Sequence, residues 1–358
     1  MKMTLTSSSS NTALSRAARR ITVGDVAEAS GVSATTVSYV LSGRDGTRIS
    51  DGTRQRIVET AASLGYRRNA LGSALRSGRT NTIGIIAPVN LMTSPPGTPG
   101  AVYFKDLVLF LSAAAFEAGF NPMFMSEDPT HKISLSDLAD RRVDGVILFA
   151  KVDVQKFVQE ARDYQVPCVT IGSEYGDYRV STDHFKGAGM ATEHLLELGH
   201  RKIGYLWSGK NGFANSSRRE GYQHALQRAG LAVRAEWEIG AAPATIRTLL
   251  CAPDRPTAFF CYNEELAVVL LDICHELKIQ VPQDLSIVGF DDTILAVMAR
   301  PQLTTIHSPL MELSQTAVEL LHQQIRGESC SSEPVFVAPS LVKRDSTCLP
   351  PELALANS

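Results

Sequence analysis

Residues 22–41 read TVGDVAEASGVSATTVSYVL, and this stretch decides the fold of the N-terminal part of the chain. Thr22 and Asp25 have the spacing of a capping box, in which each side chain bonds the backbone amide of the other residue. Gly31 permits a tight turn, and Ser33 is placed to cap a second helix. The stretch therefore predicts two short helices joined by a glycine turn.

Apolar residues at helical spacing predict that three short helices pack together between residues 21 and 66. Ser50 can cap the third helix, and Gly65 is a good residue to end it. The residues expected in their shared core are Val26, Ala27, Val37, Val40, Leu41, Ile57, Ala61 and Leu64. Two helices joined by a turn are common, so this spacing alone does not establish a DNA-binding helix-turn-helix.

The outward face of the second helix gives a better indication, because its side chains are small or carry hydroxyl groups. The residues left on that face are Ala34, Thr35, Ser38, Tyr39 and Ser42. Hydroxyl groups can bond base edges or phosphates in the major groove, and methyl groups can contact thymine. A merely solvated face would more often carry Lys and Glu, so the pattern favours DNA binding.

Charge is unevenly distributed along the 358 residues. Residues 1–79 hold 12 Lys and Arg against 5 Asp and Glu, whereas the rest holds 23 against 32. Neutralising phosphates releases counterions and supplies most sequence-independent affinity for DNA, so the basic end is the candidate nucleic-acid end. A solvated basic face remains the alternative on charge alone. Residues 1–20 are expected to form a disordered, weakly basic arm.

From residue 80 onward, short apolar runs alternate with amphipathic helical stretches. The runs expected to be strands are 82–87, 144–149, 167–171, 202–207, 257–262 and 285–290, with a shorter run at 179–182. The helical stretches are 104–118, 187–198, 219–229 and 264–277. Continuous apolar runs are typical of strands buried on both faces, so the pattern predicts parallel sheets covered by helices on both sides. Residues 94–100 are a candidate mobile loop.

Several functional classes are disfavoured. No apolar run approaches the roughly 18 residues of a membrane helix, and the N-terminal stretch lacks the apolar segment of a secretory signal. The six cysteines form no CxxC pair and have no metal-ligand spacing with histidine, which favours reduced thiols in the cytoplasm. An exported sugar receptor would need a signal sequence and would lack the basic three-helix head.

An enzyme with a nucleotide cofactor is the other alternative. Residues 204–210, GYLWSGK, superficially match the start of a phosphate-binding loop, but Asn211 replaces the required Ser or Thr. The chain contains no GxGxxG, GxSxG or HExxH motif, and its eight histidines are scattered. His194 and His200 are better interpreted as structural residues at a helix end. We therefore expect no enzyme activity, no cofactor and no metal site.

Residues 22–41 resemble the DNA-binding segment of the LacI/GalR family of transcription regulators, together with Thr53-Arg54, Leu64-Gly65-Tyr66 and Asn69-Ala70-Leu71. The resemblance covers nearly all of the chain after the N-terminal arm. The later matching blocks are EHL at 193–195, LGH at 198–200, RREGY at 218–222, VP at 281–282, GFDD at 289–292, LTTI at 303–306 and LVKRDS at 341–346. Their order and spacing together are specific, although each block alone is weak.

The resemblance implies how the head would contact DNA. Ala34, Thr35 and Tyr39 match base-reading positions, and Ala34 can offer only a methyl group. The other residues expected at the DNA interface are Thr22, Ser33, Thr36, Ser38, Arg54 and Asn69, of which Thr36, Ser38 and Arg54 match phosphate contacts.

The resemblance also implies that residues 67–79 form a hinge helix on the operator, with Leu75 wedged into the minor groove. Arg68, Gly72 and Ser73 depart from the family pattern of proline, alanine and arginine. Glycine inside a helix costs about 1 kcal/mol against alanine, so this hinge should fold less readily by itself.

For residues 80–345 the resemblance implies a core like periplasmic sugar-binding proteins, made of two parallel-sheet subdomains. The fold class is therefore an all-α helix-turn-helix head plus a type I periplasmic-binding-protein-like α/β core. The expected bounds are 80–198 with 303–327 for the first subdomain and 199–302 with 328–345 for the second, followed by a tail at 346–358.

By resemblance, Arg218, Asn263 and Asp291 contact an effector in the cleft between the subdomains, with Asp183 a weaker candidate. Asp183, Asn263 and Asp291 follow apolar runs, and Arg218 is expected to begin the next helix, so all four should lie at the carboxyl ends of strands. Their carboxylate, amide and guanidinium groups suit the hydroxyls of a sugar or sugar derivative.

Two further features concern the wall of this cleft. Tyr103 could add an aromatic wall, whereas helix-start packing is the better interpretation of Phe104. Glu264 stands where the family usually has Asp, a change that could alter the pocket.

The partners follow from this interpretation. One recognition helix reads only a few base pairs, so a homodimer, or a higher oligomer, on a palindromic double-stranded operator is expected. The chain is expected to be a cytoplasmic repressor that responds to a small-molecule effector, most simply a carbohydrate, and that has no contact with membranes.

Overall fold

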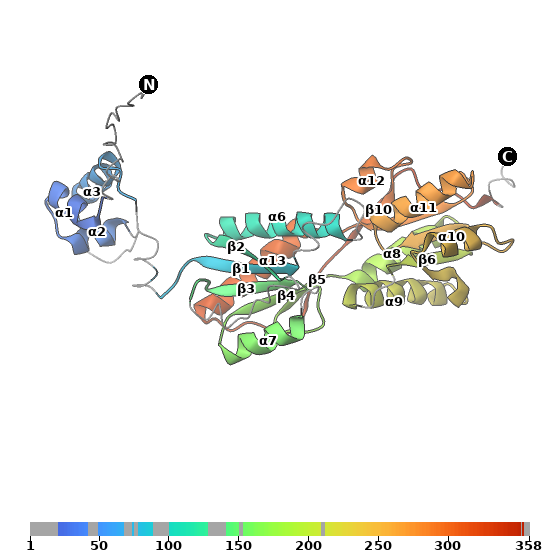
Figure 1. Cartoon of the computed structure of the whole chain (residues 1–358), viewed down its shortest axis with the longest axis horizontal. Coiled ribbons are helices and arrows are strands. Elements are labelled where there is room, and N and C mark those ends of the chain that lie inside the picture. Colours follow the sequence, from blue (N-terminus) through green and yellow to red (C-terminus); the bar gives the residue numbers. More distant parts are fainter. Residues whose placement is uncertain are drawn as a thin grey trace, which may run out of the picture. The chain divides into compact units, whose positions relative to one another are not determined.

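The computed structural model describes residues 21–41, 49–67, 74, 78–88, 100–127, 141–149, 153–208, 212–351 and 353. The chain divides into two compact units, Met1–Gly78 and Arg79–Ser358. In the first unit, helices α1 (Val23–Ser30), α2 (Ala34–Leu41) and α3 (Asp51–Ser63) pack against one another (Figure 1). Each helix contributes one fully buried residue to their core, namely Val26, Val37 and Ile57.

The predicted caps are present in the first unit. Thr22 Oγ1 accepts from the Asp25 amide at 3.3 Å, and Asp25 Oδ2 accepts from the Thr22 amide at 2.7 Å. Ser33 Oγ accepts from the Thr36 amide at 3.1 Å, and Gly31 ends α1 with a φ of 66° that favours glycine. The capping box and the glycine turn are therefore confirmed.

The prediction that Leu64 is buried is wrong. Leu64 is the C-cap of α3 and is 36% exposed. Gly65 turns the chain back with a φ of 66°, and the Tyr66 amide donates to the Ala61 carbonyl at 2.9 Å. This turn places Tyr66 against the helical core. Extending the helical spacing through the last turn of α3 therefore predicts too many buried residues.

The second unit contains two six-stranded sheets. In the first, the strand order is β11-β5-β4-β3-β1-β2, and in the second it is β12-β10-β9-β8-β6-β7. All adjacent pairs are parallel except β10 with β12. The strands are β1 (Thr82–Pro88), β2 (Asn121–Glu127), β3 (Gly145–Phe149), β4 (Cys168–Ile171), β5 (Arg179–Thr182), β6 (Ile203–Trp207), β7 (Glu238–Gly240), β8 (Ala258–Cys261), β9 (Ser286–Asp291), β10 (Thr304–His307), β11 (Val335–Val337) and β12 (Ser340–Val342).

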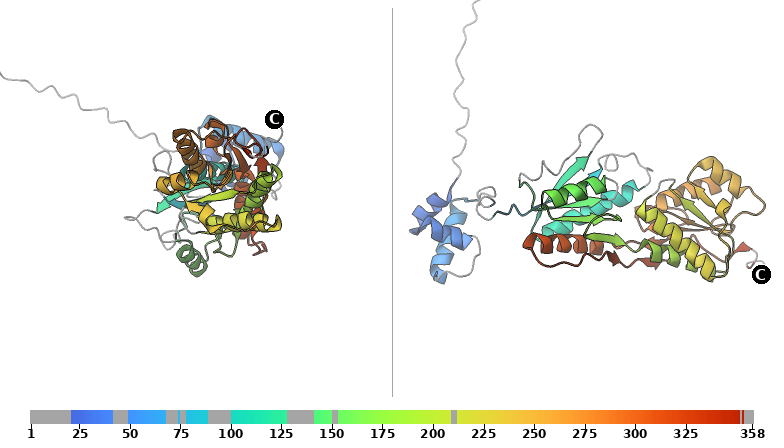
Figure 2. Two further views of the ribbon diagram at one scale, coloured as in Figure 1. Left: turned by 90° about the vertical axis from the view of Figure 1, so that its right-hand side faces the viewer. Right: turned by 90° about the horizontal axis from the view of Figure 1, so that it is seen from below.

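Helices cover both faces of the first sheet, as the continuous apolar runs predict. Ile83 and Ile85 of β1 pack in one cluster with α6 (Ala101–Glu117) and α13 (Leu310–Arg326). Ile86 of the same strand packs in another cluster with α7 (Val154–Asp163). Successive side chains of a strand point to opposite faces, so β1 is buried on both. Figure 2 shows helices on both sides of this sheet.

The second sheet is covered in the same way. Phe259 of β8 packs with α10 (Pro243–Leu250) and α11 (Glu264–Glu276), and the adjacent Phe260 packs with α8 (His184–Glu197) and α9 (Phe213–Arg228). The short helix α12 (Ile294–Met298) and the 3-10 helix η2 (Ala235–Trp237) complete this subdomain. The predicted fold class is confirmed.

The expected bounds of the two subdomains need correction. Helix α8 packs on the second sheet and β10 belongs to it, whereas β11 belongs to the first sheet. The chain therefore crosses between subdomains after β5, after β10 and between β11 and β12 (Figure 1). The alternation of strands and helices does not reveal which sheet a helix covers. Here α8 is fixed by close packing, since a Cβ on Gly187 would lie 2.8 Å from the Phe290 ring.

The expected tail also begins later than predicted. Ser346 is fully buried, its hydroxyl accepts from the Thr304 amide at 2.9 Å, and its carbonyl accepts from the Ile287 amide at 2.8 Å. The Cys348 amide donates to Ser286 Oγ at 3.0 Å. Residues 346–348 are therefore part of the second subdomain.

Candidate functional site

The predicted DNA-contacting residues of α2 lie on its outer side. Ala34, Thr35 and Tyr39 are exposed, while Thr36 and Ser38 are partly buried. Figure 1 shows α2 against α1 and α3, which support its opposite face. The helix therefore combines a buried apolar face with an exposed face of methyl, hydroxyl and phenol groups.

The remaining predicted DNA-contacting residues divide into three groups. Thr22 and Ser33 are exposed but are also capping residues, and the Ser33 and Thr36 hydroxyls are 2.8 Å apart. Arg54 of α3 is partly buried. Asn69 and Leu75 lie outside the described residues, as do the arm at 1–20, most of the hinge at 67–79 and the loop at 94–99.

In the second unit, Arg218 is the centre of a buried polar cluster. Helix α9 begins at Phe213, so Arg218 lies in its second turn and does not begin the helix as predicted. The sequence pattern missed the first turn because that turn carries asparagine and serine instead of a regular apolar spacing. Arg218 is only 2% exposed, and its guanidinium lies 3.6 Å from the centre of the Phe290 ring.

The guanidinium donates to groups from three different elements. Nη2 bonds Asp291 Oδ1 at 2.8 Å, Nη1 bonds the Tyr262 carbonyl, and Nε bonds His184 Nδ1 at 3.3 Å. Tyr262 follows β8, Asp291 ends β9 and His184 begins α8. The predicted residues Arg218 and Asp291 are thus directly paired, and His184 is a member that the sequence analysis missed.

Asp291 is held in an unusual conformation at the end of β9. Its φ is 105° and that of Asp292 is 58°, both in the region that non-glycine residues rarely adopt. Burial raises the pKa of Asp291 above its usual range, although Arg218 acts in the opposite direction. The carboxylate is therefore stabilised by Arg218 in a site that otherwise disfavours its charge.

Asn263 caps α11 directly after Tyr262. Its Oδ1 accepts from the Leu266 amide at 3.2 Å, while Nδ2 is buried and has no hydrogen-bond partner among the described residues. A buried amide donor without a partner costs free energy, so the group is poised to bond an acceptor. Asn263 thus lies beside Arg218 and Asp291 at the carboxyl ends of β8 and β9.

Glu264 and Glu265 extend this cluster with two buried carboxyl groups. Glu264 Oε1 accepts from the Asp292 amide at 2.9 Å and from Thr305 Oγ1, and Oε2 accepts from Thr293 Oγ1 at 3.2 Å. Its contacts hold the turn that follows Asp291. Glu265 Oε1 accepts from the Gly100 amide at 3.1 Å, which joins the second subdomain to the start of α6 in the first.

The weaker candidates have distinct positions. Asp183 caps α8, because its Oδ1 accepts from the Lys186 amide at 2.9 Å. This contact is structural, and Asp183 lies at the first crossover between β5 and α8. Tyr103 of α6 is partly buried, and burial raises the pKa of its phenol, with Asp291 raising it further. Phe104 packs in the first core 5.7 Å from Phe149, so helix-start packing is confirmed for it.

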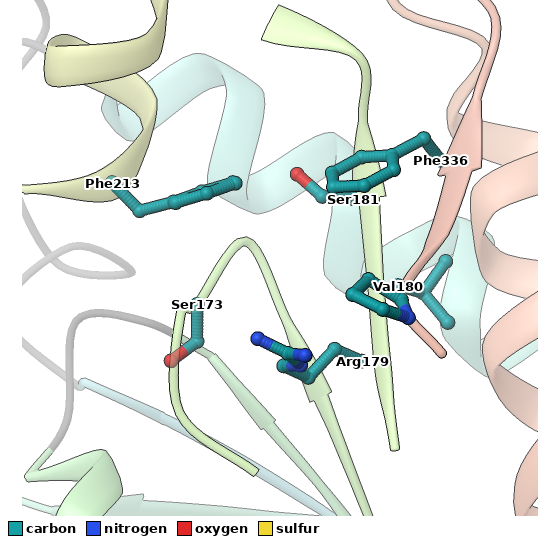
Figure 3. Close-up of a pocket in the computed structure, with 7 residues that line it drawn as sticks. Ser173, Arg179, Val180, Ser181, Phe213 and Phe336 are labelled. Atoms are coloured by element: carbon teal, nitrogen blue, oxygen red, sulfur yellow. The ribbon is translucent and has the colours of Figure 1, made fainter. Parts of the chain in front are cut away.

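A small pocket lies beside the buried cluster. Figure 3 shows Phe213 of α9 facing Ser173, Arg179 and Phe336 of the first subdomain across it. Its volume of about 30 Å³ suits one or two water molecules and is too small for a sugar. None of the predicted effector residues lines this pocket, but the Phe213 ring packs 6.1 Å from the ring of His184.

Comparisons with known proteins match both units. Residues 22–69 match the model of bacterial regulatory proteins of the lacI family, and residues 192–347 match that of a periplasmic binding protein-like domain. The HTH-type transcriptional regulator DegA of Bacillus subtilis is 31% identical over 92% of this chain and 98% of its own length. The chain belongs to the lacI family of bacterial regulatory proteins.

Other members of the lacI family are similar over their whole length. The HTH-type transcriptional repressor PurR of Photobacterium profundum is 29% identical over 91% of this chain and 98% of its own. A solved structure described as the transcriptional regulator CelR-cellobiose complex has a TM-score of 0.65 and 26% identity, covering 91% of this chain and all of the other. This lacI-family chain is therefore a DNA-binding transcription regulator and not an enzyme.

Two features are absent from the described part of this lacI-family chain. No helix there is both long enough and apolar enough to cross a membrane. No group of three or more His, Cys, Asp or Glu side chains among the same residues is arranged to hold a metal ion.

Proposed function

We propose that the chain is a repressor that binds a palindromic operator as a homodimer in the cytoplasm. Its effector would be a carbohydrate bound in a cleft beside Arg218, Asn263 and Asp291. The observation that carries the effector part is the buried polar cluster at the carboxyl ends of β8 and β9, where open parallel sheets bind ligands.

The chemistry of the cluster favours an uncharged polyol over an anion. Arg218 is already paired with Asp291 and is almost fully buried, so its charge is not available to a second carboxylate or phosphate. Asn263 Nδ2 can donate to a hydroxyl oxygen, and the remaining guanidinium N–H groups can do the same. Tyr103 would supply an aromatic wall from the first subdomain. CelR, described in complex with cellobiose, supports a sugar as ligand.

The DNA-binding part rests on α2 as the recognition helix. Ala34, Thr35 and Tyr39 are exposed and can reach base edges, whereas Thr36, Ser38 and Arg54 would contact phosphates. By the family pattern Asn69 and Leu75 add contacts from the hinge, with Leu75 as the wedge in the minor groove.

Exposed apolar side chains support a homodimer. Leu109 and Phe116 share one side of α6 and are 68% and 75% exposed. Ile294, Val297 and Met298 share one side of α12 and are also exposed. Exposed apolar groups gathered on one side of a helix are typical of an interface, and a second copy of the chain would cover both helices.

Selection of DNA from a random pool with the purified full-length chain tests the DNA-binding part. We expect the selected DNA to be palindromic. Arg54→Ala should weaken binding similarly on all sequences, and it should lower the slope of log affinity against log salt by about one, as expected for one lost phosphate contact. Arg56→Ala, which changes an exposed arginine elsewhere on α3, is the matched control. Recovery of no preferred sequence would refute the proposal.

Addition of pentoses, hexoses and disaccharides to the selected complex tests the effector part. A sugar that changes operator affinity in the original chain, but not in a folded Asn263→Ala variant, would support the cleft. If an acidic metabolite acted and no neutral sugar did, the carbohydrate assignment would be wrong.

A further inference from the structure

The Arg218–Asp291 ion pair is bonded to two of the three crossovers. His184 begins α8 immediately after the first crossover, at Asp183, and Ser308 lies in the second crossover, between β10 and α13. His184 bonds Arg218, and Ser308 bonds Asp291. A continuous set of contacts therefore runs from one crossover through the ion pair to the other.

His184 meets Arg218 through a specific atom. Its Nδ1 lies 3.3 Å from Arg218 Nε, which always carries a hydrogen, so Nδ1 must be the acceptor. The residue is 5% exposed, and its ring packs 5.8 Å from Phe290, the same ring that lies under the guanidinium. Burial, together with the charge of Arg218, keeps the pKa of His184 well below its usual value. The ring is therefore neutral, with its hydrogen on Nε2.

Ser308 meets Asp291 twice. Its hydroxyl donates to Asp291 Oδ1 and its backbone amide donates to the Asp291 carbonyl, both at 3.4 Å. Ser308 is 2% exposed. The unusual backbone of Asp291 is thus tied to the chain segment that leads back into the first subdomain.

We propose that His184 is a positioning residue that couples the effector site to the crossovers. It accepts the Arg218 Nε–H through Nδ1 and so directs the guanidinium toward Asp291, while Ser308 transmits the position of Asp291 to the second crossover. This inference rests on the proposed function, because it assumes that an effector acts on Arg218 and Asp291. His184 and Ser308 would then carry the effect of site occupancy to the segments that join the subdomains.

The physical basis is that few residues absorb the motion between subdomains. Rotation of two domains is taken up by the segments that connect them, here the crossovers. A ligand that draws the guanidinium or the carboxylate toward itself changes the bonds at Nε and at Oδ1. Those bonds end on residues at or beside the first and second crossovers. A small shift of the ion pair would therefore move these crossovers.

Two substitutions separate positioning from packing. His184→Leu places an apolar side chain of similar size against Phe213 and Phe290 but removes the acceptor. His184→Asn is smaller but places its side-chain oxygen near the position of Nδ1. If His184 acts only by packing, His184→Leu should be the less damaging substitution. If His184 positions Arg218, His184→Asn should be the less damaging one. His224→Leu, at an exposed histidine further along α9, is the matched control.

The first experiment needs no effector. Nitrogen-15 NMR of the histidine-labelled full-length chain at pH 7 distinguishes the two neutral tautomers and the charged ring. Comparison with His184→Asn assigns the His184 signals. We expect the tautomer with hydrogen on Nε2. A hydrogen on Nδ1 or a charged ring would overturn the proposal.

The second experiment measures operator affinity of the full-length chain with and without ribose, glucose or cellobiose. An active sugar should change operator affinity by roughly 5- to 150-fold in the original chain. We expect His184→Leu to reduce this change to less than about twofold while sugar affinity falls by less than about tenfold. His184→Asn should retain most of the change, and His224→Leu all of it. Equal loss in the leucine and asparagine variants, or full retention in both, would overturn the proposal.

Failure of the proposed function gives a different result. If none of these sugars, nor any other neutral sugar, alters operator binding, the carbohydrate assignment is wrong. The NMR measurement then still decides the His184 contact. A thermal unfolding scan of each variant completes the test, since a smaller stability loss for the leucine variant than for the asparagine variant, matched by a better retained sugar response, would indicate packing and overturn positioning.

Discussion

At the scale of single residues, the most consequential feature is a charged pair removed from water. Arg218 and Asp291 are each less than one-tenth exposed, and Arg218 uses three of its nitrogens on protein acceptors. Such a pair contributes little net stability, because desolvation offsets its attraction, but it is costly to break on one side only. Loss of the effector response in a variant at either residue therefore has two explanations, altered binding and unfolding.

Asp291→Ala separates these explanations by its effect on stability. Removing the carboxylate leaves the Arg218 charge buried without its partner, so we expect the second unit to lose about 3–5 kcal/mol of unfolding free energy. Denaturant unfolding followed by tryptophan fluorescence measures the change. Asp272→Ala, at an exposed aspartate of α11, should alter stability by less than about 0.5 kcal/mol. A loss below about 1 kcal/mol for Asp291→Ala would mean that the pair is more solvated than its burial indicates.

Glu264 makes stability depend on pH. Burial, and then Asp291, raise its pKa well above the ordinary value of 4.5. A carboxyl group with a raised folded-state pKa binds its proton more tightly when folded. Its stabilising contribution is therefore complete below the unfolded-state value and is lost as pH rises through the folded-state value.

Glu264→Gln should remove this dependence while keeping the size of the side chain. The stability of the variant relative to the original chain should increase with pH above about 4.5, at most by about 1.4 kcal/mol for each pH unit. Calorimetric melting of both chains across a pH series measures the difference. A difference that stays constant with pH would show that Glu264 titrates normally in the folded chain.

At the scale of elements, the start of α6 depends on a residue from another subdomain. Its N-cap is Gly100, which has no side chain to accept from the free amides of the first turn. Glu265 at the start of α11 supplies the acceptor instead, at 3.1 Å from the Gly100 amide. A carboxylate at a helix N-terminus is also favoured by the helix dipole, so this contact holds the two subdomains together.

Glu265→Ala should therefore loosen the first turn of α6. We expect a loss of about 1 kcal/mol, seen as several-fold faster hydrogen exchange in peptides that cover residues 100–107. Glu265→Gln keeps an acceptor oxygen and should show a smaller change. Exchange in peptides from α7 should stay the same, and acceleration there as well would indicate general destabilisation of the subdomain instead of a lost cap.

Helices and strands whose ends are set by nearby residues could be predicted from the sequence. Capping residues and turn glycines act within a few residues, so Thr22, Gly31 and Gly65 could be interpreted correctly without the fold. The apolar runs likewise located seven strands, namely β1, β3, β4, β5, β6, β8 and β9, but they did not predict β2, β7, β10, β11 or β12. Leu64 was misplaced because its burial depends on where the third helix stops, and α8 because its packing partner, Phe290, is far away in the sequence.

The candidate site could be predicted only in part for the same reason. Arg218, Asn263 and Asp291 are proposed from family resemblance, and Asn263 and Asp291 also from their place after apolar runs. His184 and Ser308 carry no local signal, because their importance comes from contacts across 34 and 17 residues of chain.

At the scale of the whole molecule, the proposed function requires two copies of the chain to act on one operator. A single recognition helix reads few base pairs, so we expect operator specificity to depend on bringing two copies together. The effector unit carries the exposed apolar sides of α6 and α12, which suit this task. Dimer formation, operator specificity and effector response are therefore expected to fail together when these helices are altered.

Paired charges on these helices should separate the dimer and leave the fold intact. Leu109 and Met298 are 68% and 67% exposed, so Leu109→Glu with Met298→Glu disturbs no core packing but places like charges in the proposed interface. Sedimentation should then show the monomer mass, and operator affinity should fall by about 10³-fold or more, toward non-specific binding. Because a monomer contacts about half of the phosphates, the slope of affinity against salt should also fall by roughly half. Tyr164→Ser, which removes an exposed aromatic group at the end of α7, should keep the dimer mass. A double variant that stays dimeric would place the interface on other surfaces, whereas a monomer with full operator specificity would contradict reading of the operator by two recognition helices.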